Sequence, residues 1–325
     1  MTSQEPEPRR RAAARLALAR LGLALACGTW ALAAGALQLR AAPAQCGIAA
    51  ATAPLPPAEA AQALPDSRPV PGQRDIRWAW LGSPTRRYPH GALGSPVHAG
   101  SLHVLVAGVS GSMQELQYQL PLQRVFEDRV PRLADLDGDG RDEIILVESD
   151  LLRGSAVVVF GVARATAPAG AGAAAVRLAE IARSPPTGSS FRWLNPIGVA
   201  DFDGDGRPDI ASVSTPHIGG VLTLYRFAAP QLLPFATRVD VSNHRMGEVE
   251  QQLALVLEPV GQRPVILVGD MQLRALQALR WEAPGQWQEL AEPLALPERI
   301  EQLAPMPGGG CLRLANGSWW RVLQR

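Results

Sequence analysis

Residues 133–147 read LADLDGDGRDEIILV, and residues 199–213 read VADFDGDGRPDIASV. In each stretch three aspartates stand at alternate positions with glycines between them, and an apolar run of β-type composition follows at once. The aspartates are Asp135, Asp137 and Asp139 in the first stretch and Asp201, Asp203 and Asp205 in the second. Carboxylates crowded into one turn repel each other unless a cation lies between them. The two stretches therefore predict cation-binding loops that lead into β-strands.

Both loops contain the ligand types that calcium prefers. Calcium takes about six to eight oxygen ligands, and alternate side chains of a tight turn converge on one point. Each loop also ends with an acid at the ninth position. We expect the glycines at positions 138, 140, 204 and 206 to adopt the positive φ angles that side chains resist. The predicted ligands are the carboxylates of Asp135, Asp137, Asp139 and Glu143 with the carbonyl of Arg141, and those of Asp201, Asp203, Asp205 and Asp209 with the carbonyl of Arg207.

An EF-hand begins with the same acidic spacing and has to be excluded. Its loop needs a bidentate glutamate at the twelfth position and a helix on each side. The twelfth residues here are Leu146 and Ser212, and β-type sequence follows each loop. The missing helices also argue against a dockerin-like pair. Asp-Gly is common in ordinary surface turns, but two copies with the same order of acids and glycines argue against a chance match.

The segments DLDGDGRDEI and DFDGDGRPDI resemble the calcium loops of FG-GAP/VCBS repeats, the blade type of the integrin α-chain β-propeller. The resemblance implies that each loop joins two strands of one blade and that a calcium ion pins the hairpin. It also implies two calcium sites, formed by the ten residues given above. The first loop departs from the family pattern at Glu143, where aspartate is usual, which implies a looser first site.

The remaining sequence predicts an all-β chain. Short β-type runs are separated by Gly, Pro, Ser and Asp, and no long amphipathic helix stands out. The acidic loops lie 66 residues apart, and 56 residues further on the segment 257–268 repeats the pattern without the acids. Periods of about 40 to 60 residues with about four short strands each are typical of propeller blades. We therefore expect a β-propeller of roughly five four-stranded blades over residues 75–325.

The N-terminus predicts export. Arginines between residues 9 and 20 precede an apolar run over residues 21–39, and Ala42 and Ala44 form a small-x-small cleavage site. We expect residues 1–44 to be a signal peptide, which would place the protein in the periplasm or outside the cell. The alternative is an uncleaved anchor in the inner membrane, because the apolar run is about long enough to span a bilayer. Residues 45–74 are rich in Ala and Pro and predict a flexible or polyproline-like linker.

Two cysteines, Cys46 and Cys311, would remain after cleavage. They could pair in an oxidising compartment or remain free thiols, and the sequence leaves both readings open. In a propeller a bond between them would reinforce the closure of the ring.

Composition and motifs restrict the function. With 31 basic and 30 acidic residues the formal net charge is +1, so nothing favours nucleic acid as a partner. The chain has no lysine, which together with its many Ala, Gly, Pro and Arg residues is typical of a GC-rich bacterial genome. No G-x-S-x-G, H-E-x-x-H or phosphate-binding glycine loop is present. His217 follows a β-type run and could line a central mouth.

These observations favour an exported, calcium-stabilised propeller that acts as a non-catalytic protein- or glycan-binding module. The alternative is a secreted hydrolase or lyase on the same scaffold, because a fold does not determine function. Trp319 and Trp320 favour a core or blade edge over a sugar-stacking platform.

Overall fold

A computed structural model describes residues 37–47, 56–107, 112–164 and 176–324. All of them belong to one compact unit, Ala34–Arg325. Within these ranges the chain forms 23 β-strands and two short 3₁₀-helices, so the predicted all-β class is confirmed. No helix among the described residues is long and apolar enough to cross a membrane.

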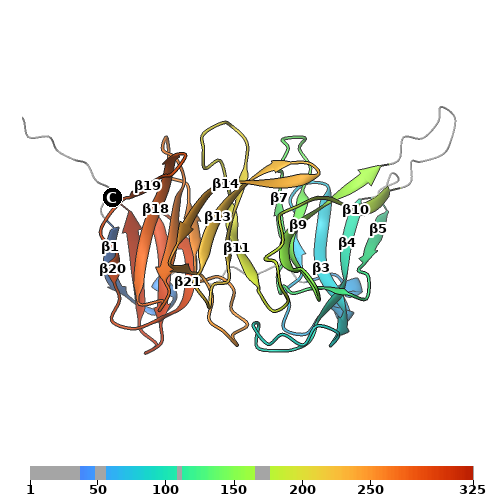
Figure 1. Cartoon of the computed structure of the whole chain (residues 1–325), viewed down its shortest axis with the longest axis horizontal. Helices are drawn as coiled ribbons and strands as arrows, with labels where there is room; N and C mark the ends of the chain where they lie inside the picture. Colours follow the sequence, from blue (N-terminus) through green and yellow to red (C-terminus); the bar gives the residue numbers. More distant parts are fainter. Residues whose placement is uncertain (1–36, 48–55, 108–111, 165–175, 325) are drawn as a thin grey trace, which may run out of the picture. The chain divides into compact units, whose positions relative to one another are not determined.

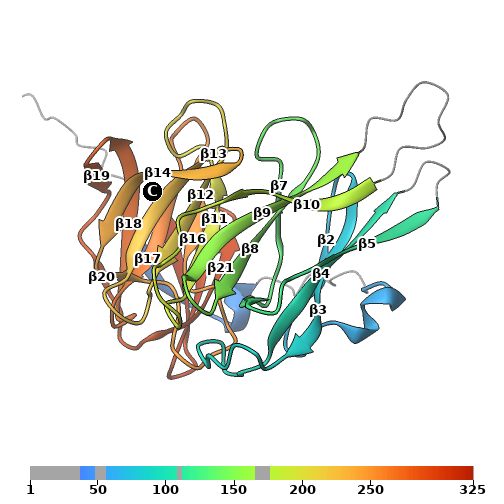
Figure 2. The ribbon, with the colours of Figure 1, turned by 45° about the vertical axis from the view of Figure 1, so that its right-hand side comes forward.

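The strands form three hydrogen-bonded sheets of 13, 6 and 4 strands (Figures 1 and 2). We divide them, in chain order, into five antiparallel groups, which we call the first to fifth meanders. The first contains β2 (Val70–Pro71), β3 (Ile76–Thr85), β4 (His98–Ala107) and β5 (Met113–Gln119). The second contains β6 (Arg124–Phe126), β7 (Arg132–Ala134), β8 (Glu143–Asp150), β9 (Gly154–Arg164) and β10 (Val176–Arg183). The third contains β11 (Leu194–Ala200), β12 (Asp209–Ser214), β13 (Val221–Ala228) and β14 (Gln231–Val239).

The fourth and fifth meanders complete the chain. The fourth contains β15 (Val241–Ser242), β16 (Leu255–Leu257), β17 (Val265–Asp270), β18 (Ala275–Ala283), β19 (Gln286–Glu289) and β20 (Leu294–Ala295). The fifth contains β21 (Ile300–Met306), β22 (Gly309–Leu314), β23 (Trp319–Gln324) and β1 (Leu37–Ala42). Pairing through β6 and between β10 and β14 joins the first three meanders into one continuous sheet.

The first strand of the chain completes the last meander. β1 pairs antiparallel with β23 from Leu37 opposite Gln324 to Ala42 opposite Trp319, and Figure 1 shows this blue strand beside the C-terminal strands. Leu37 and Leu39 pack against the core of the fourth and fifth meanders. The predicted cleavage after Ala44 would separate β1 from this sheet. The rest of the predicted signal peptide, residues 1–36, lies outside the described residues.

The described part of the predicted linker differs from the expected tether. A 3₁₀-helix, η1 (Ala44–Gly47), follows β1, and a second one, η2 (Ala58–Gln62), precedes β2. Ala60 packs against Trp80 of β3, and Leu64 is 2 % exposed within the core of the first meander. Apolar side chains between the prolines thus pack against the first meander. The local sequence pattern does not reveal this contact.

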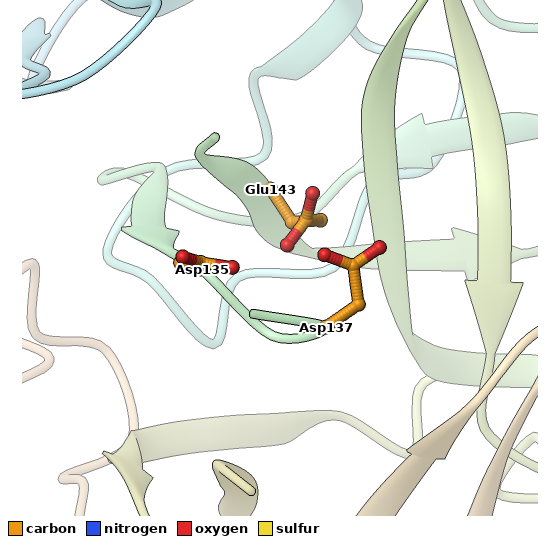
Figure 3. A group of neighbouring side chains, drawn as sticks. All are labelled: Asp135, Asp137 and Glu143. Atoms are coloured by element: carbon orange, nitrogen blue, oxygen red, sulfur yellow. The ribbon is translucent and has the colours of Figure 1, made fainter. Parts of the chain in front are cut away.

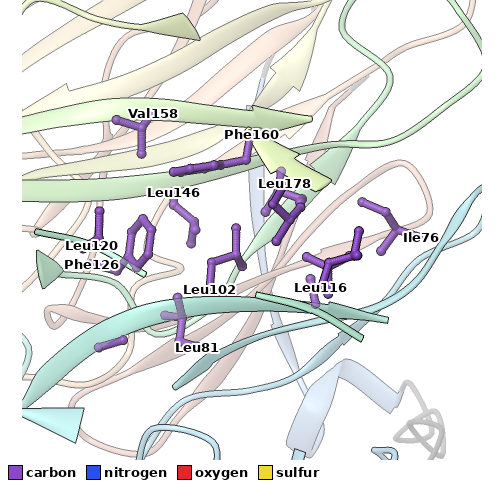
Figure 4. Packing of buried hydrophobic residues seen from close by; sticks show 14 of the residues in the cluster. Ile76, Leu81, Leu102, Leu116, Leu120, Phe126, Leu146, Val158, Phe160 and Leu178 are labelled. Carbon is purple, nitrogen blue, oxygen red and sulfur yellow. The ribbon is translucent and has the colours of Figure 1, made fainter. Parts of the chain in front are cut away.

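Successive meanders pack on each other through apolar side chains that alternate along the strands. Leu81 and Leu102 of the first meander meet Leu146 and Phe160 of the second (Figure 4). Three further core clusters join the second meander to the third, the third to the fourth and the fourth to the fifth. Among the described residues no such cluster joins the fifth meander to the first. The outer face of the first meander instead packs against η2.

Candidate metal centres

Each acidic loop joins two strands of one meander. Asp135 directly follows β7 and Glu143 opens β8, while Asp201 directly follows β11 and Asp209 opens β12. The segment after Leu257, which has no acid at the ligand positions, joins β16 to β17 in the same way. The repeated sequence therefore corresponds to a repeated hairpin, and only two of its three copies carry the acids.

The structure brings three carboxylates together in each loop. Oxygens of Asp135, Asp137 and Glu143 lie within 4.8 Å of one another, and in Figure 3 the three side chains point to a common space. The second loop does the same with Asp201, Asp203 and Asp209. Both groups could hold a metal ion, because acids from the turn meet an acid from the following strand.

The first aspartate of each loop organises the turn. Asp135 accepts hydrogen bonds from the backbone N–H groups of Gly138 (2.7 Å) and Gly140 (3.0 Å). Asp201 accepts the equivalent bonds from Gly204 (2.7 Å) and Gly206 (2.9 Å). These glycines have φ angles between 75° and 87°, as the sequence predicts. The loops are therefore shaped by their own hydrogen bonds before any ion enters.

The other predicted ligands have different positions. Asp139 and Asp205 lie outside the two groups of converging oxygens, and each accepts the backbone N–H of the arginine two residues later. Arg141 and Arg207 are both exposed, and the guanidinium of Arg141 lies 3.8 Å from Asp139. In the described geometry each cluster therefore has three carboxylates rather than the four that alternation predicts.

The closing acids, Glu143 and Asp209, are the buried members of the two clusters. Burial raises the pKa of Glu143 from 4.5 to about 7, with a smaller contribution from the neighbouring aspartates. Its Oε2 atom accepts the backbone N–H of Leu136 at 2.7 Å, which opposes the rise.

Asp209 is 1 % exposed, and neither of its carboxylate oxygens accepts a hydrogen bond of good geometry from the protein. Burial, and then the charge of Asp203, raise its pKa from 3.8 to about 7. The backbone N–H of Phe202, the equivalent of Leu136, lowers the pKa slightly but falls short of hydrogen-bond geometry. Burying a charged carboxylate without a partner costs free energy. A cation bound beside Asp209 would provide the missing partner.

Arginines that the sequence analysis missed contact both loops. Arg226 of β13 stands directly opposite Asp209 in the sheet, donates to Asp203, and lies 3.7 Å from Asp205. At the first loop Arg74 donates to Asp142 at 2.7 Å and lies 3.9 Å from Asp135. Both arginines come from outside the loops, so no spacing within the acidic stretches could have revealed them.

A cavity of about 550 Å³ lies between the two loops. Asp135 and Asp201 contribute to its wall, together with Arg132 and Arg207. The two acidic loops therefore open onto one space and lie at the same end of their meanders.

Histidines gather at the opposite ends of the strands. His217 and His244 are joined by a 2.8 Å hydrogen bond between ring nitrogens, and both pack against Trp193. Burial lowers the pKa of His217 to about 4 and that of His244 to about 3, so both are neutral near pH 7. His90 binds the buried Glu127 at 2.6 Å. His217, which the sequence places after a strand, thus lies in a cluster of aromatic and imidazole rings.

Exposed apolar side chains lie at the same end of the strands as this cluster. They lie in the turns and loops after β5, β8, β10, β12 and β15, away from the acidic loops. These residues, which we call the apolar rim, are Leu122, Leu151, Leu152, Phe191, Ile218, Met246 and Val249. Phe191 contacts both Tyr88 and His90, and the backbone N–H of Gly247 bonds to the carbonyl of Ala92. The rim and the ring cluster therefore belong to one end of the molecule.

The structure joins Cys46 and Cys311 in a disulfide with a Cα–Cα distance of 5.8 Å. The bond connects the segment after β1 to β22, and Arg321 of β23 donates to the carbonyl of Cys46 at 2.6 Å.

Trp320 packs against the core of the fifth meander, which favours the core role over a sugar platform.

No protein-family model matches the chain, and a search of curated proteins finds no match. The functional interpretation therefore depends on the sequence motifs and the geometry.

Proposed function

We propose that the chain is an exported, calcium-stabilised β-propeller of the FG-GAP/VCBS type that binds a protein partner. The observation that carries the calcium proposal is Asp209, a buried carboxylate with two unpartnered oxygens beside Asp201 and Asp203. An ion between these groups would supply the missing partner and remove the mutual repulsion.

Calcium fits this donor set better than other common ions. Both clusters offer only oxygen ligands from carboxylates, with no cysteine or histidine among them. Zinc and copper prefer nitrogen and sulfur ligands, and magnesium keeps most of its water shell. The irregular loops can also provide backbone carbonyls and water, as the flexible coordination of calcium allows.

Calorimetric titration of the full chain, after treatment with chelator, tests the metal sites. We expect the wild-type chain to bind two calcium ions. Each of the variants Asp137→Ala and Asp203→Ala is expected to bind one. The exposed Glu282 provides a control, and Glu282→Ala leaves the stoichiometry at two. A chain that takes up no calcium and melts at the same temperature with and without it would refute the proposal.

Three observations support the propeller arrangement. Each of the five meanders has at least four strands, and each pair of consecutive meanders shares a buried apolar cluster. The inner strands β11, β16 and β21 contact each other in sequence. β1 completes the fifth meander from the opposite end of the chain, which is how propeller rings usually close. We propose that each meander is one blade, which gives the expected number of five.

The apolar rim supports protein binding at the end away from the calcium loops. Leu152 is 81 % exposed and Ile218 is 62 % exposed, although apolar side chains of this size are usually buried. Clustered apolar side chains on an exposed end are typical of protein interfaces. We favour a protein partner over a glycan because six of the seven rim side chains are not aromatic, so the rim offers little surface on which a sugar could stack.

Photo-crosslinking in the producing cell tests this role. A photoreactive residue at Ile218 or Met246 is expected to give the same single crosslinked protein. The matched control is Val260, which is fully exposed at the end that carries the acidic loops. Identical products from Val260, or none from either rim position, would contradict a binding face at the rim.

Export is proposed from the basic and apolar N-terminal sequence, and the disulfide supports an oxidising compartment such as the periplasm. Cleavage after Ala44 would remove β1 and leave the fifth meander with three strands. Anchoring in the inner membrane is the alternative, and it keeps β1 and the four-stranded fifth meander.

A further inference from the structure

A serine, a histidine and a glutamate of the first meander form a hydrogen-bonded series. The Nε2 atom of His103 lies 2.8 Å from Ser101 Oγ, and its Nδ1 atom lies 2.7 Å from Oε1 of Glu115. In serine hydrolases these two contacts join the serine, the base and the acid that orients the base. We propose that the chain carries a serine esterase site here, an activity beyond the proposed binding role and independent of calcium.

The strands position these groups. Ser101 and His103 are two residues apart on β4, so both side chains lie on the same face. β4 pairs with β3 on one side and β5 on the other, and Glu115 of β5 is diagonal to His103. Neighbouring positions such as Leu102 and Val104 point to the opposite face and pack in the core. The triad therefore stands on rigid backbone.

A second serine brings the series to the surface. Ser101 is fully buried, and its hydroxyl donates at 2.8 Å to the Oγ of Ser83, which is exposed. Ser83 has a φ of 51°, a conformation that non-glycine residues rarely adopt. Strained backbone of this kind presents the nucleophile in several hydrolase folds. We therefore assign Ser83 as the reacting hydroxyl. The Ser101 hydroxyl, which donates to Ser83 in the structure, has to rotate toward Nε2 of His103 before it relays the Ser83 proton.

Packing holds His103 in the orientation that this transfer needs. Trp80 stacks on the imidazole with ring centroids 5.4 Å apart and planes 16° apart. A Cβ on Gly82 would lie 2.5 Å from Nε2 of His103, so only glycine leaves room for the ring. Because the carboxylate of Glu115 can only accept, Nδ1 carries a proton and Nε2 is left to accept from Ser101.

The reaction is the hydrolysis of an O-acyl ester. Ser83 Oγ attacks the carbonyl carbon, its proton passes to Ser101 Oγ, and the Ser101 proton passes to His103 Nε2. The adduct expels an alcohol, which takes a proton back along the series, and an acyl group remains on Ser83. Water then attacks that acyl group, giving up a proton to the series, and releases the acid. One ester and one water become one acid and one alcohol.

The test uses the full chain, a fluorophosphonate probe and p-nitrophenyl acetate. We expect one phosphonate adduct, located on Ser83 by peptide mass spectrometry, and ester turnover that Ser83→Ala abolishes. Ser101→Ala and His103→Gln are expected to lower the labelling rate by about 100-fold, the usual size of a lost base. Glu115→Gln, whose side chain is 39 % exposed, is expected to lower it about tenfold without disturbing the core.

Ser189→Ala, an exposed serine outside the series, serves as the control and keeps the wild-type rate. Melting temperatures show which variants are folded, and Glu115→Gln keeps the test decisive if Ser101→Ala unfolds. His103→Gln is also expected to remove the pH dependence of labelling. No adduct, an adduct on another residue, or a Glu115→Gln rate equal to that of the control would overturn the proposal.

Discussion

Substitution of Asp209 by asparagine is expected to change stability in opposite directions with and without calcium. The folded chain raises the pKa of Asp209 from 3.8 to about 7. Without a cation, the unfolded state therefore releases this proton at lower pH than the folded state does. As pH rises from about 4 to 7, the contribution of Asp209 to the free energy of unfolding therefore falls by roughly 4 kcal/mol.

The histidines make a direct measurement on the wild type ambiguous. Burial lowers the pKa values of His217 and His244, so their contribution to stability rises with pH in the same window. The difference between wild type and Asp209→Asn cancels that contribution, since both proteins keep the histidines. Chemical denaturation in chelator at several pH values gives this difference.

Near pH 4, where Asp209 is protonated, we expect the two proteins to differ by no more than about 1 kcal/mol. At pH 8 in chelator, the Asp209→Asn variant has no buried charge at this position, so it becomes more stable than wild type by roughly 4 kcal/mol. In excess calcium the order reverses, because the ion stabilises only a chain that can bind it. Glu282→Gln, at an exposed position, should follow wild type throughout.

A difference that stays constant between pH 4 and 8 in chelator would refute the assignment of Asp209 as a buried, unpartnered carboxylate. A variant that remains more stable than wild type in excess calcium would refute its role as an ion ligand. The two results are independent, so the assignment of Asp209 as a buried carboxylate and its assignment as an ion ligand are tested separately.

Other predictions concern the arginine at the second loop and the two ends of the chain. Arg226→Gln removes a guanidinium that donates to Asp203, and should raise calcium affinity at that loop about tenfold in calorimetry. Arg238→Gln, on β14 and salt-bridged to Glu289, is the control. Equal affinities in the two variants would contradict competition between Arg226 and calcium for Asp203. A chain that starts at Gln45 lacks β1 and should melt at a lower temperature than one that starts at Leu37, whereas equal melting would mean that β1 adds nothing. Cys46→Ser should lower the free energy of unfolding by about 2–5 kcal/mol in denaturant titration, with reduced wild type showing the same loss.

The acidic loops were predictable because their information is local. Glycines at fixed spacing, aspartates at alternate positions and the acid that closes each loop all lie within nine residues, and the structure gives them the turn that this spacing requires. The all-β class was predictable for the same reason, since strand periodicity is local. Asp139 and Asp205 lie outside the converging sets in this structure, because alternation ignores the hydrogen bonds that they accept from the backbone.

Contacts between distant segments were not predictable. Arg226 reaches the second loop only through the register of β12 and β13, and Ser83 meets Ser101 only through that of β3 and β4. The role of residues 37–42 was also hidden, because a short apolar run after basic residues is typical of a signal sequence whether or not it later pairs with β23. Sequence patterns describe one strand at a time, whereas these sites depend on which strands are neighbours.

The pairing of β1 with β23 has a consequence for biogenesis. If the chain is exported N-terminus first, the strand that emerges earliest has to wait for the one that emerges last. Until synthesis and translocation are complete, the final sheet lacks its outer strand and its unpaired backbone is open to other chains. Contacts of such long sequence separation also form slowly. A periplasmic chaperone that protects the waiting strand, or an oxidase that seals Cys46 to Cys311 once it has docked, would therefore control the yield of this protein.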